Sequence, residues 1–353
     1  MIKKSLVAVA LMGAFGAASA QSSVAIYGTL DAGLSKRTNS GNTSTMVGKR
    51  DNNKLGFRGV EDLGNGLKAL FQLEIRYEPD TGVIENTTRP LFQGQSRVGL
   101  QGDFGTVRIG RGLTAFQETS TAFEPWSGMP AAAGYQTDLQ VAGYSSDPLS
   151  PVGNSANRFS NAVFYNTPVI AGIFQLNATV ASKDANNGPV IIGRGTALAP
   201  QFPANSMAAV VPYSLSGTAT SGPMAAYVAY ERNAVDTRLW SVGASFKPIP
   251  ALKLMGSYQK QDQERSVLIN PETKAWLVGA NYTIGPGLIR AGYGQKRPDN
   301  AFGTPNIAKT KQVSIGYDYN LSARTYLYVD AARKKITPAT TFNFYSLGIH
   351  HNF

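Results

Sequence analysis

Apolar and polar residues alternate with a period of two along most of this chain. Between Leu67 and Tyr77, for example, Phe71 and Leu73 alternate with Gln72 and Glu74. Such alternation predicts strands that have one apolar and one polar face. Similar segments recur at residues 24–34, 106–110, 238–246, 251–260, 274–282, 312–319, 324–333 and 344–353. Most have roughly the length, about 8 to 11 residues, with which a tilted strand crosses a bilayer.

The connections between these segments alternate in length. Short connections rich in Gly, Pro, Asn and Asp are predicted at residues 61–66, 102–105, 247–250, 285–287 and 320–322. Long polar connections are predicted at residues 35–52, 78–95, 112–157, 184–205, 261–273 and 296–309. A soluble β-sandwich would also show the two-faced strands, but short turns at one rim and long loops at the other are typical of an outer-membrane barrel. The pattern therefore predicts an all-β fold, a transmembrane antiparallel β-barrel.

The number of strands is less tightly constrained. An even number brings both chain ends to the same rim, and sixteen fit if a weak strand lies within Asn205–Ser216. Pro212 disfavours that strand, because proline cannot donate a hydrogen bond to a sheet. Fourteen and eighteen strands also agree with the pattern.

The first twenty residues have the features of an export signal. Lys3 and Lys4 precede an apolar stretch, Leu6–Phe15, which is too short to span a bilayer, and Ala18-Ser19-Ala20 fits a signal-peptidase site. We therefore expect a cleaved signal peptide at residues 1–20 and a single barrel domain at residues 21–353.

Charge and composition narrow the functional classes. The whole chain has 33 basic and 22 acidic residues. Without Lys3 and Lys4, 31 basic residues remain, a net charge of +9 for the mature chain. Such an excess suits nucleic acid, an anionic surface or anionic solutes, and nucleic acid is the least expected partner of an exported protein. Cysteine is absent, which excludes disulfides and thiolate chemistry.

Two motifs that suggest enzymes lack the necessary context. Residues 110–115 match G-x-G-x-x-A, but no helical pattern follows them, as a dinucleotide site would require. His350 and His351 are the only histidines, and neighbours on a strand face opposite ways. A zinc site or a histidine-based catalytic pair is therefore not expected. We expect no enzyme activity, no cofactor and no metal.

Five blocks of sequence resemble general diffusion porins of the Gram-negative outer membrane. They are Ser23–Gly33, Leu55–Leu67, Gly102–Arg111, Arg158–Tyr165 and Leu347–Phe353. The resemblance implies a sixteen-stranded barrel whose third long loop folds into the lumen, and residues 112–157 occupy the place of that loop. It also implies a homotrimer. We expect contact with outer-membrane lipid and lipopolysaccharide, and the net charge of +9 favours small anionic or neutral solutes as the permeating species.

Strand parity and this resemblance together suggest the residues of a pore constriction. A basic wall is expected from Arg58, Arg76, Arg97, Arg108 and Arg158, with Lys68 nearer the periplasmic rim and Arg111 at the start of the loop. The resemblance places acidic residues opposite, on the loop, and these are Glu118 and Glu124, with Asp138 and Asp147 behind them. It also suggests that Phe353 serves as an assembly signal.

Two functions from different classes agree with these features. The first is a water-filled channel for passive diffusion of small hydrophilic solutes and ions, with a weak preference for anions. The second is an adhesin or structural anchor whose long loops form the working surface. The long inward loop favours the channel, because an adhesin gains nothing from a narrowed lumen.

Overall fold

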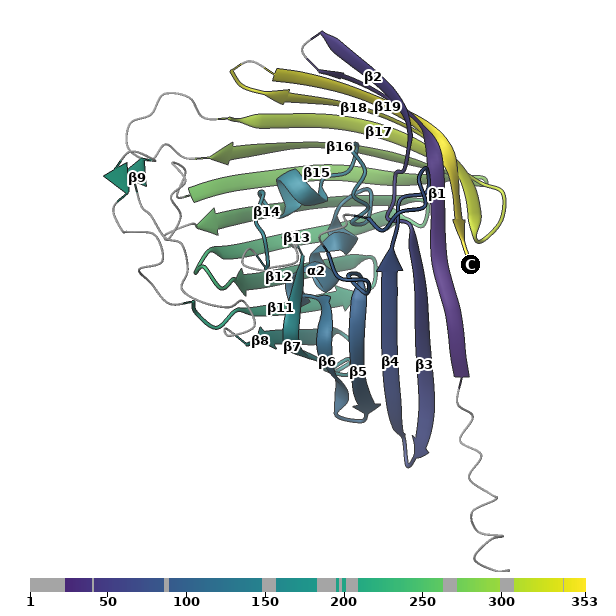
Figure 1. The fold of residues 1–353 in the computed structure, drawn as a ribbon, viewed down its shortest axis with the longest axis vertical. Helices are drawn as coiled ribbons and strands as arrows, with labels where there is room; N and C mark the ends of the chain where they lie inside the picture. Colours follow the sequence, from purple (N-terminus) through teal and green to yellow (C-terminus); the bar gives the residue numbers. More distant parts are fainter. Residues whose placement is uncertain are drawn as a thin grey trace, which may run out of the picture.

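The protein forms one closed β-barrel in a computed structural model (Figure 1). The structure describes residues 23–39, 41–85, 89–147, 157–182, 195–196, 199–200, 209–262, 272–298, 308–338 and 340–353. The signal peptide expected at residues 1–20 lies outside these ranges. The strands of the first half are β1 (Ser23–Asn39), β2 (Asn42–Gly48), β3 (Lys54–Gly64), β4 (Leu67–Arg76), β5 (Gln95–Gly102), β6 (Gly105–Leu113), β7 (Arg158–Asn166) and β8 (Phe174–Ala181).

The second half continues the same antiparallel order. Its barrel strands are β11 (Tyr213–Ser221), β12 (Met224–Arg232), β13 (Arg238–Ile249), β14 (Leu252–Asp262), β15 (Glu272–Ile284), β16 (Gly287–Pro298), β17 (Thr310–Asn320), β18 (Thr325–Ile336) and β19 (Thr340–Asn352). A separate two-stranded ribbon consists of β9 (Gly195–Thr196) and β10 (Ala199–Pro200).

The barrel closes where β1 lies beside the last strand. The extracellular half of β1 pairs with both β19 and β2, and its first residues, Ser23–Thr29, pair with β3. β2 and β3 are thus two parts of one strand interrupted at residues 49–53, which gives sixteen barrel strands in the described part of the chain. The expected count of sixteen is confirmed. The doubtful strand is β11, which begins directly after Pro212, so the proline needs no place in the hydrogen-bonded ladder.

The two faces of the strands separate as the alternation predicts. On β17 the outward residues Val313 and Ile315 are 51% and 57% exposed, while Gln312 and Ser314 are buried towards the lumen. Apolar side chains cover the outside because only they suit hydrocarbon, and polar ones face the water inside. Among the described residues, no helix is long and apolar enough to cross a membrane.

One predicted loop is wrong. Residues 35–52 were expected to form a long connection, but β1 and β2 pair as far as Asn39 and Asn42. Thr and Ser are frequent in this stretch, and both are compatible with a paired strand that extends beyond the membrane. Only residues 49–53 leave the barrel wall, between β2 and β3.

The described part of the segment between β6 and β7, residues 114–147, lies inside the barrel (Figure 1). It contains α2 (Ala115–Ser120), η1 (Thr121–Phe123) and η2 (Gln136–Gln140). The segment contacts the wall in chain order, with α2 against β6, β8, β11 and β12, η1 against β13 and β14, and η2 against β14, β15 and β16. The inward fold expected of this loop is therefore observed in its described residues, and the loop narrows the lumen from that side.

Candidate functional site

Three arginines project into the lumen from the wall formed by β3 to β6. Arg58 on β3 and Arg97 on β5 both pair with Gln72 of β4, so the three side chains share one face. Arg108 follows on β6, two residues from the position that pairs with Arg97. The sheet register therefore builds a row of cations along one wall.

Hydrogen bonds fix two of these arginines. Arg97 donates from Nε and Nη2 to Gln72 Oε1, at 3.2 and 3.1 Å. Its Nη1 lies 3.1 Å from Glu118 Oε1, and Arg108 Nη2 lies 3.4 Å from Glu118 Oε2. Arg108 also donates to Asn166 Oδ1. Glu118 thus bridges two wall arginines from the loop side.

Arg58 is held more loosely. Its guanidinium lies 5.2 Å from the centre of the Tyr27 ring, and the residue is exposed to the lumen. The Tyr27 hydroxyl donates to Glu74 and accepts from Gln72 Nε2 at 2.8 Å, which fixes the ring. Arg58 is therefore the most accessible cation of the row.

The position of Glu118 depends on how α2 is anchored. Thr114 caps the helix by accepting from Gln117 N. The first backbone N–H groups donate to wall hydroxyls, Ala115 N to Thr179 Oγ1 at 3.0 Å and Phe116 N to Ser214 Oγ at 2.9 Å. These bonds satisfy groups that a helix leaves unpaired at its start, and they direct Glu118 towards the arginines.

The local charge is positive. Arg58, Arg97 and Arg108 together with Glu118 carry a surplus of two positive charges. Arginine stays protonated at any working pH. Lys68, expected nearer the periplasmic rim, lies close to the β3–β4 turn and is exposed.

A second group of arginines lies towards the extracellular side. Arg76 contacts Glu74 at 3.4 Å, and Arg111 donates to Gln93 O and Ser160 Oγ. Arg158 is only 7% exposed and donates to Gly94 O and Asn157 Oδ1, each at 2.7 Å. Arg158 was expected on the open lumen wall. Its side chain instead donates its hydrogen bonds to these backbone and side-chain acceptors, beside the β6–β7 register shift between Gly110 and Gly112.

Glu124 also differs from the expectation that it faces the pore. Its side chain is fully buried and accepts hydrogen bonds from Trp126 N, at 2.8 Å, and from Gly128 N. Burial raises the pKa of Glu124 to about 7, against the opposing effect of these N–H groups. The residue therefore shapes a turn of the loop instead of presenting charge to the lumen. An acidic residue before Pro and an aromatic suits such a turn as well as a pore wall, so the residue types alone do not separate the two roles.

Of the two remaining acids, Asp138 holds the loop against the barrel wall. Asp138 lies 3.5 Å from Lys296 Nζ and forms a shorter ion pair with Lys334. The two lysines lie on β16 and β18, on the lumen face of these strands. Although burial acts to raise the pKa of Asp138, these lysines hold it below its usual value. Burial raises the pKa of Asp147 to about 6, with Arg111 acting in the opposite direction.

A buried polar network on the far side of the lumen was not expected. Arg50, in the break between β2 and β3, lies 2.6 Å from Asp318 and 3.7 Å from Asp330. Arg290 Nη2 lies 2.9 Å from Asp318, and Trp126 of the loop donates to Asp330. The alternation along β17 and β18 predicts that Asp318 and Asp330 face the lumen. Arg50 lies in residues 35–52, which were expected to form a long connection, so its contact with Asp318 could not be predicted.

The histidines face opposite ways, as expected. His350 is buried beside Asp31, with Nδ1 3.0 Å from Oδ2, and it stacks on Tyr326. His351 is exposed and lies 2.9 Å from Thr325 Oγ1.

A closed barrel with an apolar exterior, a charged polar lumen and a loop packed inside it defines a diffusion channel of the outer membrane. The family model described as Gram-negative porin matches residues 7–337. The chain belongs to this family, and it is a non-enzymatic porin of the Gram-negative outer membrane.

Curated relatives and solved structures agree with this assignment. The chain is 29% identical to outer membrane porin protein 32 of Delftia acidovorans, over 99% of this chain and 94% of that protein. It is 28% identical to major outer membrane protein P.IB of Neisseria lactamica, with both chains covered completely. The structure of the anion-selective porin from Comamonas acidovorans superposes with a TM-score of 0.75 at 22% identity, covering 94% of this chain and all of that one.

Proposed function

We propose that this porin prefers anions, and that Arg58, Arg97 and Arg108 provide the preference. The observation that supports this most directly is the surplus of two positive charges where α2 lies opposite the arginine row. Small anionic and neutral hydrophilic solutes would pass, and cations would meet a repulsive field. The anion-selective porin from Comamonas acidovorans has the same fold, which agrees with the proposal.

The adhesin alternative is disfavoured by the anchoring of the inward segment. Hydrogen bonds from Ala115 and Phe116 and ion pairs of Asp138 hold described parts of it against the lumen wall. Such anchoring shapes the interior and leaves these residues unable to act as an external binding surface.

The assembly proposed is a homotrimer in the outer membrane. An apolar stripe on β1 is strongly exposed, with Val24 at 67% and Ile26 at 63%, and it continues through Leu30 and Leu34. Such a stripe suits a neighbouring subunit as well as lipid. The mass of the detergent-solubilised protein by native mass spectrometry tests the trimer, and a monomer mass under all conditions would contradict it.

The anion preference should depend on salt. Screening lengths fall from about 10 Å at 0.1 M to about 3 Å at 1 M, so ions in the lumen feel the arginines less at high salt. We expect the ratio of anion to cation permeability to decline towards one as KCl rises over this range. Reversal potentials measured at a fixed ratio of salt concentrations across the membrane check this expectation. A permeability ratio that does not change with salt would mean that the width of the pore, and not its charge, sets the preference.

Phe353 is proposed to act in assembly. Its N–H and C=O exchange two hydrogen bonds of 3.1 Å with Gly28 of β1, and its ring occupies the space where a side chain on residue 28 would lie. In Phe353→Ala we expect a severalfold lower yield of barrel in the outer membrane with an unchanged conductance for each channel, because the ring packs at Gly28 of β1 and is not part of the arginine row. Quantitative immunoblots of membrane fractions measure the yield. An unchanged yield would leave Phe353 as a packing residue only.

A further inference from the structure

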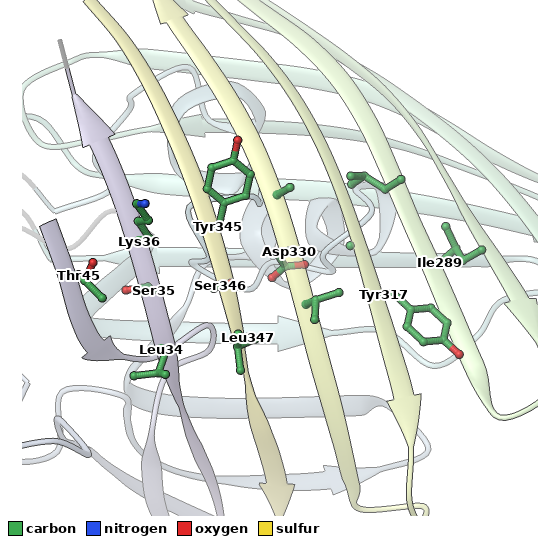
Figure 2. A pocket seen from close by; sticks show the side chains of 14 residues that line it. Leu34, Ser35, Lys36, Thr45, Ile289, Tyr317, Asp330, Tyr345, Ser346 and Leu347 are labelled. Carbon is green, nitrogen blue, oxygen red and sulfur yellow. The ribbon is translucent and has the colours of Figure 1, made fainter. Parts of the chain in front are cut away.

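The lumen contains a polar pocket beneath the inward segment, on the periplasmic side of α2 and η1. Its volume is about 340 Å³, near the lower end of the range of about 300 to 1,000 Å³ that small-molecule sites occupy. It differs from the larger groove in Figure 2, where Leu34, Tyr345 and Leu347 project from neighbouring strands of the outer surface and the lining is almost wholly apolar. The outer groove suits lipid or a neighbouring subunit, whereas the lumen pocket is accessible to dissolved solutes.

The strand register explains why a hollow forms here. Thr220 pairs with Ala225, and Ala225 pairs with Ser245, so these three residues form one row across the lumen face of β11, β12 and β13. Thr220 and Ala225 flank the short turn between β11 and β12. The short side chain of Ala225 leaves space between its two hydroxyl-bearing neighbours. Thr119 and Phe123 of the inward segment cover this space from the extracellular side.

The hydroxyl groups of the pocket are available to a solute. Among the hydrogen bonds of the described residues, none uses the side-chain oxygen of Thr218, Thr220 or Ser245. Gln175 pairs with Thr218 across β8 and β11, and its Nε2 makes only a long hydrogen bond of 3.4 Å to Thr167 O. Each hydroxyl can donate one hydrogen bond and accept two. The pocket therefore matches a solute that has several hydroxyl groups of its own.

Lys253 supplies the single positive charge among the described residues that line the pocket. Its Nζ donates to Ala122 O at 2.7 Å and lies 5.9 Å from the centre of the Phe123 ring, so η1 fixes the position of the ammonium group. An ammonium group has three donors, and this contact uses one of them. No ion pair within the described ranges includes Lys253. The lysine therefore retains both donors and an uncompensated charge.

The pocket adjoins the arginine row. Glu118 and Asn166 line it on that side, and both contact Arg108. The charge of Glu118 is compensated by Arg97 and Arg108, whereas that of Lys253 is not. An anion that leaves the row towards the periplasm therefore next meets Lys253.

We propose that this pocket is a binding site for a polyhydroxylated carboxylate, a sugar acid. Its carboxylate binds Lys253, and its hydroxyl groups bind Thr218, Thr220 and Ser245. The inference rests on the proposed anion preference, because the solute reaches the pocket past the arginine row, and it adds the class of solute. A neutral sugar would leave Lys253 without a countercharge, and an unsubstituted carboxylate would place an alkyl chain against hydroxyl groups that then lack partners.

Block of the ion current through the full-length protein in planar bilayers tests the site. The probes are gluconate, hexanoate and sorbitol, which have the same number of carbon atoms. Gluconate has the carboxylate and the hydroxyl groups, hexanoate has only the carboxylate, and sorbitol has only the hydroxyl groups. We expect gluconate to reduce the single-channel conductance in KCl with a saturating dependence on concentration. Hexanoate and sorbitol should need concentrations on the order of tenfold higher for the same reduction.

Two variants test the two halves of the site. Lys253→Gln should raise the half-blocking concentration of gluconate on the order of tenfold, because a hydrogen bond to a charged group is lost. The double variant Thr218→Val, Thr220→Val keeps the contact of Lys253 with Ala122, and it should raise this concentration severalfold without changing that of hexanoate. The matched control Arg324→Gln removes one positive charge between β17 and β18 and should behave as the wild type does.

Gluconate that blocks the wild-type channel no better than hexanoate or sorbitol would overturn the proposal, and this comparison needs no variant to fold. So would a gluconate block that either variant leaves unchanged. Reversal potentials in KCl alone test the anion preference separately. A potassium preference there contradicts the proposed function, whereas a chloride preference without selective gluconate block contradicts only this site.

Discussion

The double variant Arg58→Glu, Arg108→Glu should reverse the ion preference of the channel. The wild-type row has three arginines and one glutamate, a surplus of two positive charges, and the variant has one arginine and three glutamates, a surplus of two negative charges. A change of about 1.4 kcal/mol in the relative energy of anion and cation would alter the permeability ratio roughly tenfold. We therefore expect the reversal potential in a KCl gradient at low salt to change sign.

A control separates position from net charge. Lys247→Glu, Arg324→Glu makes the same change in total charge, but both residues lie at or beside periplasmic turns. At 0.1 M salt a charge more than about 10 Å from the ion path is largely screened, so this variant should retain the wild-type preference. Equal shifts in the two variants would show that selectivity follows total charge, and the constriction proposed here would be misplaced.

Trp126→Ala should release the inward segment from the wall and widen the channel. The Trp126 side chain is fully buried, packs against Tyr135 with ring centres 5.8 Å apart, and donates from Nε1 to Asp330 at 3.1 Å. Truncating a buried Trp costs about 3 to 5 kcal/mol, more than enough to detach a locally held segment. We expect a higher and noisier single-channel conductance and faster uptake of larger sugars by proteoliposomes.

Trp276→Ala is the matched control. Trp276 lies on β15 with its ring 5.5 Å from that of Tyr293, on the outward face of the barrel. The same truncation there removes an interfacial aromatic without touching the inward segment, so conductance should be unchanged. Conductance that is normal in both variants would mean that Trp126 does not hold the segment in place.

Much of the fold could be predicted because a membrane barrel repeats one simple rule. Each strand must present apolar groups to lipid and polar groups to water, so parity placed Gln72 on the lumen face, and parity together with the porin resemblance placed Arg97 and Arg108 there. The inward segment was predicted from its length and its resemblance to porins. The number of sixteen strands required one weak strand near Pro212, and this strand, β11, begins just after the proline.

The exceptions arise where parity has no bearing. Glu124 and Arg158 have the residue types of a pore wall, but burial and hydrogen-bond partners decided their positions, and these depend on how the loop folds in three dimensions. Arg50 reaches Asp318 only because residues 49–53 leave the barrel wall. Contacts of that kind join residues far apart in sequence, and a pattern of single strands contains no signal for them.

The reversal potential of the wild-type protein is the most direct test of the central claim. The purified protein is inserted into a planar bilayer separating 0.1 M from 0.01 M KCl, where the screening length is between about 10 and 30 Å. A water-filled channel with the observed arginine row should give open, ohmic steps and a reversal potential of the sign that marks chloride as the more permeant ion. Steps that show a clear potassium preference would contradict the anion proposal, and a protein that forms no conducting steps would contradict the account of the barrel as a channel.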